Sequence, residues 1–78
     1  MGKELHAAYP DNVGFKNGLA VSYAKLGQFH QEGDPEKARA YFSQAERLWD
    51  ELVKAFPDYV EFGRNLGNVR SVLEGLGM

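Results

Sequence analysis

The chain has 78 residues, 44% of them hydrophobic and 26% charged, with a net charge of −2 and no cysteine. This composition argues against intrinsic disorder and excludes disulfides, thiolate zinc sites and cysteine nucleophiles, while the lack of a clustered basic segment argues against nucleic-acid binding. Because a single core of this length supplies only about 3–5 kcal/mol, we expect regular helix packing or a partner to support the fold.

The N-terminal part of the chain has the periodicity of two helical segments. Residues 3–9 are expected to form a short helical piece that Pro10 closes. Residues 11–31 are expected to form a long helix with Asp11 or Asn12 as its N-cap. Large side chains at steps of three and four share one face of this helix, which we expect to be buried: Phe15, Leu19, Tyr23 and Leu26.

Residues 35–56 carry the clearest helix signal. Asp34 supplies an N-cap acceptor, Pro35 suits the first helical position, and Pro57 ends the segment. One broad apolar stripe runs along it: Ala38, Tyr41, Phe42, Ala45, Leu48, Trp49, Leu52, Val53 and Phe56. The opposite face is expected to be a solvated surface: Glu36, Arg39, Glu46, Arg47, Asp50 and Lys54.

Residues 58–75 repeat this arrangement after the proline, with Asp58 as the expected N-cap. Apolar residues line one side of the segment: Phe62, Leu66, Val69, Leu73 and Leu76. No segment alternates as a strand would, and the loops are short, so consecutive helices are expected to pack antiparallel. The sequence therefore predicts an all-α fold of three main helices plus a short N-terminal helical piece.

An internal repeat relates the two ends of the chain. At an offset of 47, residues 5–26 align with residues 52–73, and eight of the 22 positions are identical. Average composition predicts about one or two identities. The identities include both corner prolines and several apolar positions: Pro10 and Pro57, Phe15 and Phe62, Leu19 and Leu66, Leu26 and Leu73. Such a period indicates a helical solenoid, with one complete period flanked by parts of two others.

The order of small, aromatic and turn residues resembles the tetratricopeptide repeat family: Leu26-Gly27, Gly33-Asp34, Ala38, Phe42, Ala45 and Pro57. Three features depart from the family pattern. His30 stands where the family usually has Tyr, the spacing from Gly27 to Gly33 is one residue short, and that from Ala45 to Pro57 is about seven residues long. Seven residues are nearly two helical turns, so the second helix lengthens without rotating its buried face.

The resemblance implies one domain, residues 1–78, built as a TPR-like α-α superhelix of antiparallel hairpins. In that scheme residues 3–9 end a preceding helix B, residues 11–31 form helix A, residues 35–56 form helix B and residues 58–75 form the next helix A.

Small residues mark the expected helix contacts. Ala20 and Gly27 on the first long helix, with Ala38 and Ala45 on the second, allow two helices to approach closely. Three further glycines lie inside predicted helices, where each costs up to about 1 kcal/mol relative to alanine. We expect close backbone contact to compensate at these positions: Gly18, Gly63 and Gly67.

The resemblance implies a protein-interaction module that binds an extended or helical peptide on the A-helix face. Seven residues fall at these positions: Asn17, Val21, Ala24, Gln28, Arg64, Asn68 and Ser71. Asn and Arg side chains there can bond to a peptide backbone or to a carboxylate. A solvated face that binds nothing is the alternative, because the first helix lacks the paired Lys and Asn of the family's carboxylate clamp.

Self-association into a homo-oligomer is the competing function. A solenoid needs about three repeats and polar caps, whereas the last helix here has no following helix B. The candidate contact residues are Trp49, Val53, Phe62, Leu66, Val69, Val72, Leu73 and Leu76. The N-terminal piece, a second chain, exchanged helices or neighbouring repeats are the alternatives for covering the open edges.

No combination of residues indicates catalysis. His6 and His30 lack a spaced carboxylate partner, so we expect no metal site, and we expect His30 to be a packing or turn residue. No serine lies in a nucleophile elbow, and no phosphate-loop sequence is present. We therefore expect a protein that is not an enzyme and needs no cofactor. The lack of a signal peptide or an apolar span of about 18 residues predicts a cytoplasmic protein that does not bind membranes.

Overall fold

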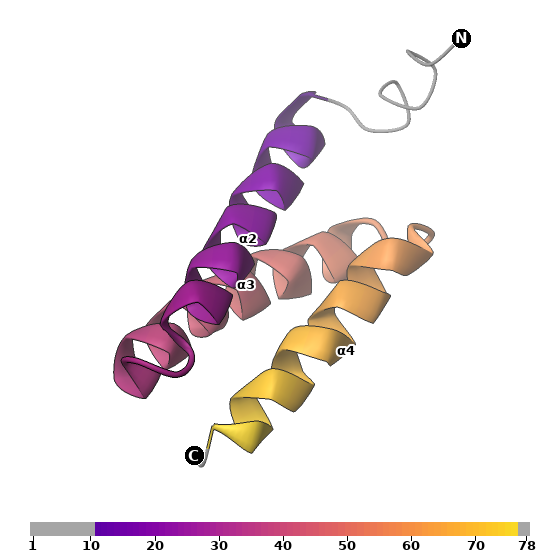
Figure 1. Ribbon diagram of the computed structural model, residues 1–78. Coiled ribbons are helices and arrows are strands. Elements are labelled where there is room, and N and C mark those ends of the chain that lie inside the picture. Colours follow the sequence, from indigo (N-terminus) through magenta and orange to yellow (C-terminus); the bar gives the residue numbers. More distant parts are fainter. Residues whose placement is uncertain (1–10, 77–78) are drawn as a thin grey trace, which may run out of the picture.

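The computed structural model describes residues 11–76, and these residues form three helices and no strand (Figure 1). Helix α2 spans Asp11–His30, α3 spans Pro35–Ala55 and α4 spans Val60–Gly75. Turns of a few residues join them, so each helix runs antiparallel to the next (Figure 1). The predicted all-α fold of antiparallel helical hairpins is confirmed. The helical piece expected over residues 3–9 lies outside the described residues.

The start of α3 is built as its sequence predicts. The Asp34 side chain accepts a hydrogen bond from the backbone N–H of Lys37 at 3.2 Å, and Pro35 occupies the first turn. The backbone of Asp34 is held as well, because its N–H donates to the carbonyl of His30 at 2.8 Å. This capped turn therefore ties the end of α2 directly to the start of α3.

The start of α4 corrects the prediction for Asp58. Tyr59, not Asp58, occupies the N-cap position, and the helix begins at Val60. The Tyr59 ring lies 5.9 Å from that of Phe56 and 5.4 Å from that of Phe62, measured between centroids. These aromatic contacts place the turn after Pro57, so packing rather than a carboxylate cap decides where α4 starts.

Helix α3 is the central helix of the described structure. It packs against both α2 and α4, which contact each other little. Figure 1 shows α2 and α4 running in roughly the same direction, with α3 behind them. The buried core draws on all three helices: Val13, Ala20, Ala38, Phe42, Ala45, Trp49, Leu52, Phe62, Leu66, Val69 and Leu73. The predicted buried stripes of α3 and α4 are thus confirmed.

The buried face of α2 is not the one predicted. Of the four residues predicted to be buried, Tyr23 packs against the core, but Phe15, Leu19 and Leu26 are exposed. Val13 and Ala20 belong to the core instead. Helix α2 has apolar residues on two opposite faces, and α3 packs on the face with the small residues. Small side chains allow the two backbones to approach closely, which increases the van der Waals contact along the whole interface.

Gly27 shows why the small-residue face is chosen. A Cβ atom at this position would lie 2.9 Å from three carbon atoms of the Phe42 ring, which is buried. The predicted close approach at Gly27 is therefore confirmed. For Gly18, Gly63 and Gly67, in contrast, an added Cβ would meet nothing within 4 Å. The expectation that close backbone contact compensates for these three glycines is wrong for contacts among the described residues.

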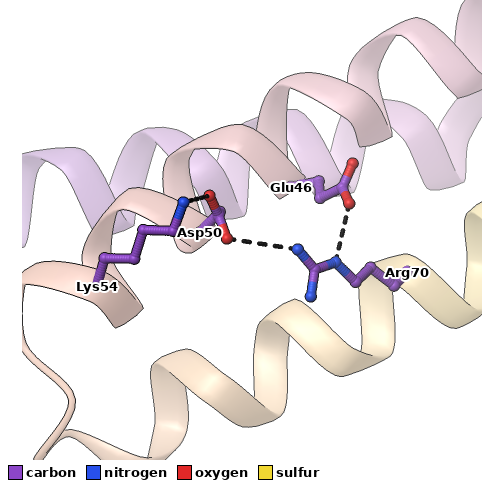
Figure 2. Close-up of polar contacts among 4 residues, drawn as sticks. All are labelled: Glu46, Asp50, Lys54 and Arg70. Carbon is purple, nitrogen blue, oxygen red and sulfur yellow. Dashed lines mark hydrogen bonds and ion pairs between the residues drawn. The ribbon is translucent and has the colours of Figure 1, made fainter.

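Ion pairs join α4 to the outer edge of α3 (Figure 2). Nε of Arg70 lies 2.9 Å from a Glu46 carboxylate oxygen, and its Nη2 lies 3.4 Å from an Asp50 oxygen. Lys54 pairs with the other oxygen of Asp50 at 3.1 Å. Glu46 and Asp50 are thus not the purely solvated surface that we expected. All four side chains are partly exposed, so each pair is worth under about 1 kcal/mol and mainly orients α4 on α3.

The two classes of glycine are expected to respond oppositely to substitution. Gly27→Ala places a methyl group against the buried Phe42 ring. Overpacking of this kind costs about 1–3 kcal/mol, which equals or exceeds the roughly 1 kcal/mol gained in helix propensity. Gly18→Ala adds only the propensity gain, so we expect it to raise the free energy of unfolding. Urea denaturation followed by circular dichroism measures both, and equal stability of the two variants would contradict the close α2–α3 contact.

Candidate functional site

A hollow of about 180 Å³ lies where the three helices meet. Helices α2 and α4 supply its sides, and α3 supplies two aromatic residues, Phe42 and Trp49, that are themselves buried in the core. The complete lining is Ala24, Gln28, Phe42, Trp49, Asn65, Asn68, Val69 and Val72. Since α2 and α4 contact each other little, the hollow exists because both helices pack on α3 instead of on each other.

Three of the seven residues predicted for an A-helix binding face line this hollow: Ala24, Gln28 and Asn68. Val21 is partly buried and packs against the core. Arg64 and Ser71 are exposed on α4 and are not among the lining residues. The structure thus brings Ala24, Gln28 and Asn68 together at the hollow and leaves Arg64 and Ser71 outside it.

Asn17, the remaining predicted residue, has a structural role. Its side-chain oxygen accepts a hydrogen bond from the Trp49 indole N–H at 2.8 Å. A buried indole N–H needs such an acceptor. One residue earlier, Nζ of Lys16 pairs with a Glu51 carboxylate oxygen at 3.1 Å. These contacts hold the Trp49 ring against α2 and thereby shape the inner wall of the hollow.

The predicted binding face lacked five of the lining residues: Phe42 and Trp49 of α3, and Asn65, Val69 and Val72 of α4. The three α4 residues and Asn68 occupy positions i, i+3, i+4 and i+7, a spacing that places four side chains on one helix face. That spacing was visible in the sequence. The sequence did not show that these residues line a hollow, because the hollow forms only when α2 and α4 pack side by side on α3.

The chemistry of the hollow is neutral and partly polar. Its eight lining residues include no ionisable and no nucleophilic side chain. Gln28, Asn65 and Asn68 carry amides, each with donors and an acceptor, while the other lining residues are apolar or aromatic. This combination suits an uncharged ligand group that offers both hydrogen-bond donors and acceptors.

The other functional possibilities find no site in the part of the chain that the structure describes. Among residues 11–76, no group of three or more His, Cys, Asp or Glu side chains is placed to hold a metal ion. None of the described helices has the length and hydropathy needed to cross a membrane. The His30 ring stacks on that of Tyr41, with centroids 5.6 Å apart, so the prediction that His30 is a packing or turn residue is confirmed.

The predicted self-association residues are mostly core residues. Trp49, Phe62, Leu66, Val69 and Leu73 are buried within the chain, and Val53, Val72 and Leu76 are partly buried against them. The expectation that α4 presents these side chains on an open edge is wrong, because the apolar face of α4 is the face that packs on α3.

Comparison with known proteins assigns no family to the chain. No protein-family model matches the sequence, and neither a curated protein nor a solved structure is significantly similar to it.

The hydrogen bond between Asn17 and Trp49 is expected to be important for stability. Asn17→Ala leaves the buried indole N–H without its acceptor, which costs about 1–3 kcal/mol. Gln44→Ala removes an exposed amide from the middle of α3, away from the helix ends, and serves as the control. Trp49 is the sole tryptophan of the chain, so its fluorescence during urea denaturation reports on this site alone. Equal midpoints for the two variants would contradict the role assigned to Asn17.

Proposed function

We propose that this protein is a non-catalytic protein-interaction module that binds a peptide segment of a partner in the hollow between α2 and α4. One observation carries the proposal: a hollow with the aromatic rings of Phe42 and Trp49 among its lining is bordered by the amide side chains of Gln28, Asn65 and Asn68. Aromatic surface gives a buried ligand group its contact area, and amides fix its orientation.

The size of the hollow favours a peptide over a small molecule or cofactor. Its volume of about 180 Å³ is smaller than the roughly 300–1,000 Å³ of typical small-molecule sites. A space of this size suits one anchoring side chain of a longer ligand. The rest of such a peptide would run across the exposed parts of α2 and α4 next to the hollow.

The polar groups of the hollow also favour a peptide. Backbone amides of an extended chain present alternating N–H and C=O groups, and side-chain amides can bond to both. The lining has no charged side chain, so we propose an uncharged anchor and not an acidic C-terminus. The absence of ionisable and nucleophilic groups from the lining is the basis for proposing a binding protein and not an enzyme.

We further propose that the helices form a tetratricopeptide-like repeat, with α2 as helix A, α3 as helix B and α4 as the next helix A. Two features support this assignment. Gly27 of α2 lies close against the Phe42 ring of α3, with Ala20 and Ala38 buried in the same core. In addition, α2 and α4 run in roughly the same direction (Figure 1). In this scheme Arg64 and Ser71 extend the binding surface along α4.

A peptide library displayed on phage tests the proposed binding site. We expect selected peptides to change the fluorescence of Trp49 and to compete with one another for one site. Gln28→Ala and Asn68→Ala each remove a hydrogen-bonding group worth about 0.5–1.5 kcal/mol, so each should weaken binding about 2- to 10-fold. Ala24→Leu fills the hollow and should weaken binding more.

Gln44→Ala is the matched control, because Gln44 is an exposed amide on α3 outside the lining. Circular dichroism establishes that each variant is folded. Peptides that bind all three hollow variants as tightly as the unchanged chain, or a library that selects no peptide that changes Trp49 fluorescence, would contradict the proposal.

A further inference from the structure

A second apolar surface lies on the outer face of α2, away from α3. Phe15 is 73% exposed and Phe29 80% exposed, and Leu19 and Leu26 are also exposed. Together these four residues form what we call the α2 stripe. At about 100° per residue, the positions 15, 19, 26 and 29 fall on one side of the helix, and Ala20 and Gly27 fall on the other. A row of large exposed apolar side chains on one helix face is typical of an interaction site.

The internal repeat shows what covers the same row elsewhere in this chain. The offset of 47 that relates Pro10 to Pro57 carries the α2 stripe onto α4: Phe15 onto Phe62, Leu19 onto Leu66, Leu26 onto Leu73 and Phe29 onto Leu76. On α4 the first three of these positions are buried, and Leu76 packs against the core. The helix that buries them is α3. The same residue pattern is thus covered by α3 on α4, whereas on α2 no other helix within residues 11–76 covers it.

Ser22, which lies between Leu19 and Leu26 on the stripe, also corresponds to a residue of α4 that packs on α3. Ser22 on α2 corresponds to Val69 on α4, which is buried against α3. Both side chains are small or medium in size, so a helix can approach either row closely. The stripe differs at its edge, because Tyr23 stands where α4 has Arg70. On α4, Arg70 pairs with Glu46 and Asp50 of α3. Because Tyr23 carries no charge, a helix that docks on the α2 stripe needs no acidic residues at the positions equivalent to Glu46 and Asp50.

We propose that the α2 stripe is a docking surface for an amphipathic helix of a partner protein, one that presents an apolar face like that of α3. Recognition is of the helix-in-groove type, in which apolar anchors recur at steps of three and four. The surface is separate from the hollow, because Ala24 and Gln28 lie on the opposite side of α2. The protein thus has two binding faces, and the second does not depend on the first.

The sequence of α3 itself is the natural probe. A fluorescently labelled peptide of residues 34–57 is titrated with the full chain, and binding is followed by anisotropy. We expect saturable binding, and we expect the double variant Phe15→Glu with Phe29→Glu to weaken it at least tenfold. Both side chains are largely exposed, so their replacement does not remove core contacts. Val60→Glu is the control, because Val60 is 68% exposed on α4, outside the stripe, and we expect its affinity to stay within twofold of the unchanged chain.

Three results would overturn the proposal. The peptide fails to bind, or it binds the double variant as tightly as the unchanged chain, which would mean that it replaces the chain's own α3 or enters the hollow. The third is a concentration-dependent dimer of the full chain in sedimentation velocity that the double variant abolishes, since a second copy would then occupy the stripe. Binding of library peptides in the hollow is measured on the same variants and is expected to be unchanged. This measurement separates a failure of the proposed docking on the α2 stripe from a failure of the proposed peptide site in the hollow.

Discussion

The contact between Gly27 and the Phe42 ring determines how the rest of the structure is arranged. It allows α2 and α3 to approach so closely that even one methyl group at position 27 would overlap the ring. Fully buried alanines on both helices, Ala20, Ala38 and Ala45, extend this tight contact along the interface. Such packing matters most in a short chain with a small core. A densely packed core makes more van der Waals contacts than a loosely filled core of the same size and is therefore more stable.

Both candidate binding surfaces follow from this contact. Because α2 turns its small residues to α3, its large apolar residues face outward and form the stripe of Phe15, Leu19, Leu26 and Phe29. Because α4 packs on α3 and hardly touches α2, a hollow remains above Phe42 and Trp49. The Asn17 side chain then completes the inner wall of the hollow by accepting the Trp49 N–H. The packing of the small-residue face of α2 on α3 therefore explains both the small hollow on one side of α2 and the exposed apolar residues on the other.

The sequence predicted those features that depend on neighbours along the chain. Asp34, Pro35 and Pro57 identify the ends of α3 almost to the residue, since capping acts within one turn. The family resemblance placed Ala24, Gln28 and Asn68 on one expected binding face, and these three residues line the hollow. The sequence did not predict which face of α2 is buried. Both faces are apolar, and packing density rather than hydrophobicity selects between them. Nor did the sequence predict the start of α4, where the Tyr59 ring and its two aromatic neighbours override the available Asp58 cap.

The close approach of α2 and α3 is therefore the central claim. Nuclear Overhauser effects between the Gly27 Hα protons and the Phe42 ring protons test it most directly. These protons belong to helices that meet only if the small-residue face of α2 is the buried one, and the effect falls off within a few ångströms. The structure predicts strong cross-peaks from Gly27 to Phe42. Cross-peaks from the Phe15 and Leu26 side chains to the α3 core residues, without any from Gly27, would contradict it.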